Sequence, residues 1–337
     1  MTRTLLAAAS GLVLVACASD DMAADETTAE AQTQAAPMAS APEAASSYDA
    51  ITTLDEATSG PSEVAMWRTG DDDTTVYMIG TVHLLRPGVE WRTDDYERAF
   101  AEADAVFIES DSLSEEAQAK AAELLPRYAF NPPGTTLASY FTEEEVAELN
   151  AAMAPVGVTI EQLAPMRPWF ASIMVAQTAM MRIGASPEAG LETMIVQQAT
   201  EAGKPVRFLE GLEEVFGILA SVDDEVQADV MLDGAEDFAN LEAEFARIVA
   251  AWYDGDADTV ADMMTEAYGD YPEAEDALFE ERNRNWTMRL KEVIDTEPGT
   301  FLVAVGAGHL AGADSLQEML QAEGYAVERL DTATGGL

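Results

Sequence analysis

Short apolar runs that are typical of β-strands lie near both ends of the chain, separated by polar turns. Residues 63–68 and 74–80 flank the turn 70–73, which is Gly followed by three Asp, and this arrangement predicts a β-hairpin. Residues 94–103 have the periodicity of a helix. Four further apolar runs predict strands, at residues 105–109, 204–210, 300–305 and 326–330.

A mostly helical pattern fills residues 114–249. Thr142, which three glutamates follow, is the start of a capping box, and the apolar segment 166–182 predicts a buried helix. Residues 272–293 and 314–323 predict two more helices. One apolar stripe steps by three and four residues and consists of Phe238, Leu241, Phe245, Ile248 and Trp252. These elements predict an α/β fold, in which N- and C-terminal strands form a central mixed sheet around a largely helical middle region.

Residues 1–17 predict a lipoprotein signal peptide. Their apolar stretch follows a basic residue and is too short for a membrane-spanning helix, which needs about 20 residues. Residues 14–17, Leu-Val-Ala-Cys, resemble the bacterial lipobox, in which the signal peptide is cut before a cysteine that carries lipid. A single cysteine placed there by chance is the alternative. Since Ala18 rather than Asp follows Cys17, we expect a lipid-anchored protein of the bacterial cell envelope, at the outer membrane and facing the periplasm.

The segment 18–62 consists mainly of Ala, Thr, Glu, Gln, Pro and Ser, and this composition predicts a disordered tether. Such residues bury too little apolar surface to offset the entropy lost on ordering. Residues 63–332 are long enough for one α/β domain with a substantial core. Because Cys17 is the only cysteine, this domain has neither a disulfide nor a cysteine nucleophile.

The charge of the chain is strongly negative, with 63 acidic and 17 basic residues and a formal net charge of −46. This balance argues against nucleic acid and against an anionic membrane surface as partners. Membrane contact is therefore expected only through the lipid anchor. The acidic surface predicts a solvated, soluble protein, with a specific cationic partner as the alternative.

Candidate chemistry is concentrated at the only two histidines of the chain, His83 and His309. Each closes the phrase Gly-x-x-His, which begins at Gly80 or Gly306 and follows a predicted strand. Glycine at that position lets the chain turn sharply or another group approach closely. If the terminal strands pair, both imidazoles meet at the end of the sheet, where ligand sites of α/β proteins tend to lie.

Two acidic residues, Glu109 and Glu210, also end predicted strands. Two imidazoles and one or two carboxylates form a suitable ligand set for a divalent ion such as zinc, manganese or cobalt, with a position left for water. A bound ion would lower the pKa of that water. Without a metal, the histidines would act in acid/base chemistry, and either glutamate would be a general base.

Arg282 and Asn283 are two further candidates. The Arg282 guanidinium would stabilise a developing oxyanion or hold a substrate carboxylate, and a salt bridge to one of the many acids is the alternative. Asn283 would orient the substrate or a ligand, or cap a local turn. The chain has no Gly-x-Ser-x-Gly elbow, no phosphate-binding loop and no His-Glu-x-x-His helix, so familiar serine hydrolases, nucleotide hydrolases and zincins fit poorly.

Together these motifs resemble the TraB/PrgY/GumN family, whose relatives include the TIKI metalloproteases and, more distantly, erythromycin esterase-like proteins. The resemblance covers residues 63–330. It rests on residues 77–83, Glu109, 203–210, Arg282, Asn283, Trp286 and 303–310. In TIKI-like members the paired Gly-x-x-His motifs and a glutamate are implicated in metal-dependent peptide cleavage. The resemblance therefore implies those roles for His83, His309 and Glu109.

The expected function is that of a lipid-anchored envelope hydrolase, which uses a metal ion to cleave a peptide or another small substrate. Two alternatives remain. One is a non-catalytic lipoprotein that sequesters a peptide or small ligand, with Arg282 as an anchor. The other is a metal-independent hydrolase of esters or lactones that uses a His/Glu pair.

Overall fold

A computed structural model of the chain describes residues 48–235 and 240–330. The signal peptide, Cys17 and residues 18–47 of the predicted tether lie outside the described residues. In the described part, no helix is both long and apolar enough to cross a membrane.

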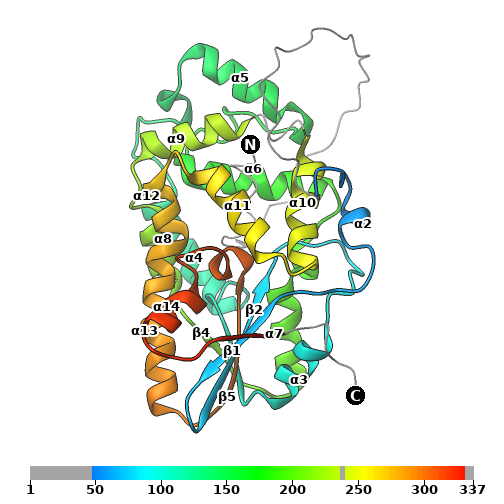
Figure 1. Ribbon diagram of the computed structural model, residues 1–337. Helices are drawn as coiled ribbons and strands as arrows, with labels where there is room; N and C mark the ends of the chain where they lie inside the picture. The colour runs from blue at the N-terminus through cyan, green and yellow to red at the C-terminus, as the bar shows by residue number, and fades with distance from the viewer. Residues whose placement is uncertain (1–47, 236–239, 331–337) are drawn as a thin grey trace.

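A six-stranded mixed sheet forms one end of the molecule (Figure 1), in the order β4-β3-β5-β2-β1-β6. Strands β4, β3, β5 and β2 are parallel, whereas β1 is antiparallel to both of its neighbours. Strand β2 from the N-terminal part therefore pairs directly with β5 from the C-terminal part, which confirms the predicted closure of the sheet. The strands are β1 Met66–Gly70, β2 Thr74–Thr81, β3 Ala105–Ile108, β4 Val206–Phe208, β5 Gly299–Gly306 and β6 Glu328–Leu330.

Helices cover both faces of the sheet. Since successive side chains of a strand point to opposite faces, neighbouring residues pack against different helices. Met78 packs in one apolar cluster with Trp286 and Leu290 of α13. Its neighbour Ile79 belongs to the cluster that contains Ile195 of α7. The covering helices are α13 (Glu281–Thr296) and α14 (Leu316–Ala322) on the first face, and α3 (Asp94–Glu102) and α7 (Leu191–Glu201) on the second.

The middle of the chain is helical, as predicted, and α5, α6 and α9 lie beyond the sheet at the other end of the molecule (Figure 1). Thr142 caps α5 in the predicted capping box. In the predicted stripe, Phe245, Ile248 and Trp252 are buried, whereas Phe238 and the side chain of Leu241 lie outside the described residues. The helices of this region are α4 Glu115–Tyr128, α5 Glu143–Met153, α6 Pro168–Arg182, α8 Leu212–Leu219, α9 Asp224–Asp233, α10 Leu241–Tyr253, α11 Ala257–Tyr268 and α12 Pro272–Glu275.

The folded part begins before residue 63, the expected start of the domain. Residues 48–62 include α2 (Leu54–Ala57) and join the main core, where Tyr48 and Leu54 are buried. The Tyr253 hydroxyl donates to the carbonyl oxygen of Gly60 at 3.0 Å. The prediction of a disordered tether up to residue 62 was therefore wrong for residues 48–62. The composition of the long polar stretch outweighed its three apolar residues at spacings of three, Tyr48, Ile51 and Leu54.

Candidate functional site

The two Gly-x-x-His phrases lie side by side at the carboxyl ends of β2 and β5. Thr81 pairs with Gly306 in the parallel register, so the two strands end together. The strands also approach closely, because a Cβ atom on Gly80 would lie 3.1 Å from the Cα atom of Ala307. Glu109 follows β3, the other neighbour of β5, and thus reaches the same edge of the sheet.

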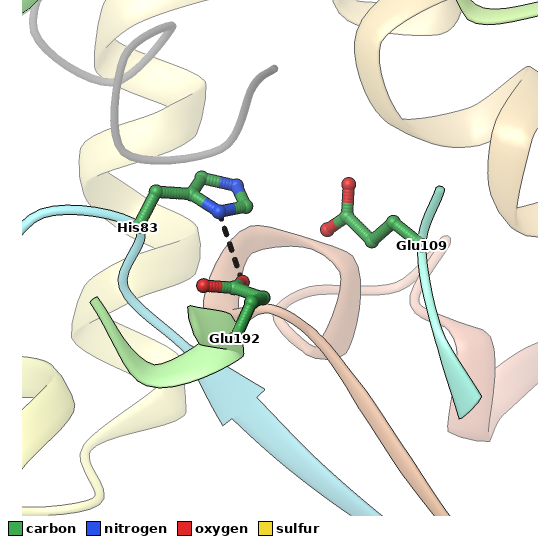
Figure 2. A group of neighbouring side chains, drawn as sticks. All are labelled: His83, Glu109 and Glu192. Carbon is green, nitrogen blue, oxygen red and sulfur yellow. Dashed lines mark ion pairs between the residues drawn. The ribbon is translucent and has the colours of Figure 1, made fainter. Parts of the chain in front are cut away.

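His83 is the centre of the first cluster (Figure 2), to which Glu109 and Glu192 contribute carboxylates. One ligand atom from each of the three residues lies within 4.8 Å of the others. The His83 Nδ1 atom is 2.9 Å from Glu192 Oε1, which lies below the ring in Figure 2, and the Glu109 carboxylate lies to the right of the ring. Glu192 stands in the first turn of α7, and the Leu191 amide donates to the Val82 carbonyl at 3.1 Å, which ties this helix to the end of β2.

The carboxylates determine the protonation of His83. Burial alone would lower the pKa of the imidazole, but the charges of Glu192 and Glu109 and the hydrogen bond to Glu192 outweigh burial and raise it to about 9. Burial would raise the pKa of Glu192, whereas the pairing with His83 and the hydroxyl of Thr81, which donates to it, lower that pKa. Since Nδ1 donates to Glu192, the Nε2 atom is left for another partner. This buried atom has no hydrogen-bond partner among the described residues.

A small cavity of about 30 Å³ lies beside these groups and has room for a water molecule or an ion. Its lining consists of the His83 cluster with hydroxyl and apolar side chains, namely His83, Ile108, Glu109, Ser110, Ser112, Leu113, Glu192 and Thr193. Among the described residues, no lysine or arginine side chain lines it.

The second cluster is built around Arg282 of α13, which is 3% exposed and therefore needs partners for all its donors. Its Nη2 atom donates to Glu109 Oε2 at 2.6 Å, and its Nε atom donates to Glu210 Oε1 at 3.0 Å. The guanidinium also lies over the Trp286 ring, 4.7 Å from the ring centroid. Burial raises the pKa of Glu210 against the opposing effect of Arg282, while the two carboxylates raise the pKa of Arg282.

His309 belongs to this second cluster. The Arg282 Nη1 atom lies 3.1 Å from His309 Nε2, and an arginine donates only, so Nε2 accepts. The proton of the neutral ring is therefore on Nδ1, which donates to Asn283 Oδ1 at 2.8 Å. Burial, the charge of Arg282 and the charge of His83 lower the pKa of His309 well below its usual value. The Asn283 amide also donates to the carbonyl oxygens of Asp314 at 2.9 Å and His309 at 3.3 Å.

The structure thus brings the predicted residues to one edge of the sheet, where they form two separate clusters. His83 and Glu109 join the potential ligand group, whereas His309 and Glu210 contact Arg282 instead. Glu109 contacts both clusters, because its Oε1 atom lies 3.9 Å from His309 Nε2. The prediction omitted Glu192. The signal for it was weak, since an acid in the first turn of a helix is common and only the preceding Gly190 marks a close approach.

The His83 cluster fits a divalent metal ion. One imidazole nitrogen and two carboxylates are donors that zinc and manganese accept. The buried Nε2 atom without a partner and the adjacent cavity are features of this structure that an ion would complete. The structure therefore contains a cluster that could hold a metal ion, with Glu192 in place of the predicted His309 and Glu210.

We expect Gly190→Ala to lower the free energy of unfolding more than the same substitution at a glycine with open space around it. A Cβ atom at position 190 would overlap the carbonyl oxygen of His83. Overpacking of this kind costs about 1–3 kcal/mol. Gly211→Ala is a matched control, because Gly211 also precedes a helix in an extended conformation and its added Cβ atom would meet nothing within 4 Å. Urea unfolding of both variants measures the difference, and equal loss of stability would contradict the close approach.

Comparison with known proteins shows which family the chain belongs to. The chain is 23% identical over 250 residues to the "Uncharacterized protein YbaP" of Escherichia coli (strain K12), and the alignment covers 73% of this chain and 87% of that protein. The protein of the same description from Shigella flexneri gives the same values. No solved structure matches the chain significantly. The TraB/PrgY/gumN family profile matches residues 65–329, which include both clusters, and the chain therefore belongs to the TraB/PrgY/gumN family.

Proposed function

We propose that this protein is a metal-dependent hydrolase of the cell envelope that cleaves peptide bonds. The observation that carries the proposal is the buried Nε2 atom of His83, which has no partner among the described residues and belongs to a side chain that lines a cavity together with Glu109 and Glu192. His83, through Nε2, and Glu109 would hold the ion, while Glu192 holds the imidazole through its bond to Nδ1. When bound, a divalent ion lowers the pKa of water and polarises a carbonyl group.

The residues around the cavity have separate tasks in this reaction. Glu192 accepts the Nδ1 proton of His83, so Nε2 is the nitrogen that can bind the ion once it loses its proton. Glu109 is held by the Gly306 amide at 2.6 Å and by Arg282, and each of its oxygens keeps a second lone pair. Glu109 is therefore the group that we expect to take a proton from the attacking water.

A neutral substrate group suits this cavity better than an anionic one. In the part of the chain that the structure describes, its lining contains acids and hydroxyls but no lysine or arginine, and Arg282 is buried among its own partners. The hydroxyls of Ser110, Ser112 and Thr193 are available to bond a carbonyl group. These features and the family resemblance support an amide or peptide substrate rather than a phosphate ester.

The envelope location is part of the proposal and rests on residues 1–17 of the sequence. Lipid on Cys17 would anchor the protein at the outer membrane, facing the periplasm. The anchor would be the sole contact with the membrane. Nucleic acid is not a partner in this proposal, since the net charge of −46 repels it.

The test is elemental analysis of the purified domain combined with a peptide-library cleavage assay, with and without a chelator. We expect one divalent ion per chain and cleavage that stops on chelation and returns when the ion is added back. Peptide binding that survives chelation without product would support the sequestering alternative instead. A preparation that binds no ion and cleaves no peptide would contradict the proposal.

Hydrolysis by a His/Glu pair without metal is the second candidate, and the His83–Glu192 contact is the observation in its favour. This candidate, like the metal site, requires His83 to lose a proton, because the neighbouring carboxylates raise the pKa of the imidazole to about 9. Ester turnover that persists in a chelator would favour this candidate.

Metal affinity is expected to fall about tenfold for each pH unit below about 9, because the ion needs the neutral imidazole. The pKa of His83 is about 9, so protons compete with the ion below that pH and cease to compete above it. Calorimetric titration between about pH 6 and about pH 8 measures the slope. An affinity independent of pH over this range would contradict the ligand role of His83.

A further inference from the structure

The two Gly-x-x-His phrases look equivalent in sequence, yet their imidazoles have different partners. The Nε2 atom of His83 has none among the described residues, and this ring lines the cavity. Both nitrogens of His309 are occupied, Nε2 by Arg282 at 3.1 Å and Nδ1 by Asn283 at 2.8 Å. His309 is 0% exposed and is not part of the cavity lining.

A continuous line of contacts leads from the second phrase to Glu109. Asn283 bonds the ring of His309, His309 accepts from Arg282, and the same guanidinium donates to Glu109 Oε2 at 2.6 Å. Gly306, the first residue of the phrase, donates its amide proton to Glu109 Oε1 at 2.6 Å. Both oxygens of Glu109 are thus held by groups that the second phrase supplies or orients.

We propose that the second Gly-x-x-His phrase is a positioning device for Glu109 and does not bind the metal ion. This inference rests on the proposed metal site and assigns unequal tasks to its two histidines. His83 is a ligand. His309 acts through Arg282, which it holds in the orientation that directs Nη2 to Glu109, while Asn283 keeps the Nδ1 proton of His309 in place.

Packing around His309 opposes the alternative in which its Nε2 atom turns to an ion. The ring packs against Trp286 at 4.3 Å and Phe279 at 5.4 Å between centroids, which restricts its rotation. If Nε2 bound an ion, Arg282 Nη1 would retain only the carbonyl oxygen of Leu278, at 3.3 Å. A buried guanidinium is costly to leave short of partners, so this exchange is unfavourable.

Nitrogen-15 NMR of the wild-type protein tests the inference directly, because two histidines give two resolvable imidazoles. In the metal-free protein we expect His309 to be neutral with its proton on Nδ1. On titration with Zn²⁺, the Nε2 signal of His83 should show the shift of a coordinated nitrogen, whereas both nitrogens of His309 should keep their signals. A coordination shift at His309 Nε2 would overturn the inference.

Matched variants give a second readout. His83→Gln is expected to lower Zn²⁺ affinity by more than about 100-fold, whereas His309→Gln should lower it by about tenfold, the lower end of the range for groups that act behind a ligand. Glutamine at position 309 keeps an oxygen acceptor for Arg282. His309→Ala lacks this acceptor and should bind Zn²⁺ about 100-fold more weakly than wild type. Equal losses in both glutamine variants would mean that both histidines are ligands.

The two proposals fail in distinguishable ways. If wild-type protein binds no Zn²⁺ and neither imidazole responds, the proposed metal site is wrong. The positioning role is then judged on the metal-free protein alone. It predicts that the Arg282 side-chain protons are protected from exchange in wild type and lose protection in His309→Ala. An Nε2-protonated or positively charged His309, or unchanged protection of Arg282 in the variant, would overturn it.

Discussion

His83→Gln is expected to abolish hydrolysis and to lower the affinity for a divalent ion by more than about 100-fold. Loss of a group behind a ligand costs about 10–100-fold, and loss of the ligand itself costs more. The variant removes the imidazole from the cavity lining, in which His83 is the one histidine. Isothermal titration with Zn²⁺ and the peptide-cleavage assay measure the two effects.

Folding must be intact for this result to bear on the site. The circular dichroism spectrum and urea midpoint of His83→Gln report on that. Glu213→Gln is a control for general perturbation, because Glu213 is half-exposed, pairs with Arg127 and is not a member of the potential ligand group. Glu213→Gln should bind Zn²⁺ like wild type. Retention of tight binding by His83→Gln would exclude His83 as a ligand.

Arg282→Met is expected to lower the free energy of unfolding by about 3–5 kcal/mol, the usual loss when one partner of a buried ion pair is removed. The substitution would leave the carboxylates of Glu109 and Glu210 buried without their cation. It also removes the donor to His309 Nε2. Urea unfolding at neutral pH measures the loss.

Arg284→Met is the matched control on the same helix. Arg284 is about half exposed and pairs with Asp276 and Glu280 at the surface, where such a pair contributes about 0–1 kcal/mol. The loss for Arg282→Met should also shrink at acidic pH, since protonated carboxylates no longer need the cation. Equal effects of the two substitutions would show that Arg282 does not hold buried charges.

Much of the fold could be predicted from local patterns. The hairpin, the strand that ends before Glu109 and the pairing of β2 with β5 follow from apolar runs, turn residues and the usual arrangement of α/β proteins. The convergence of both Gly-x-x-His phrases follows from that pairing. The ordered segment 48–62 was not predicted, because its few apolar residues join the core where α2 contacts α10, a helix far away in the sequence.

The chemistry of the site depended on contacts that periodicity does not encode. Arg282 lies on a helix that packs across the sheet, and the packing places its guanidinium between Glu109, Glu210 and His309. Since arginine donates and never accepts, this placement decides the tautomer of His309. From the sequence, both histidines were equal candidates for a ligand.

The sequence by itself therefore determined the α/β fold, the meeting of the two phrases at one edge of the sheet and the presence of Glu109 beside them. Only the tertiary structure decided that Glu192 joins His83 and Glu109 in the potential ligand group and that both nitrogens of His309 have partners. The physical reason is that the ends of the strands follow from short apolar runs, turn residues and the pairing of strands, all of which local sequence patterns indicate. The approach of the first turn of α7 to His83, and of Arg282 to His309, results from helix packing between segments far apart in the chain.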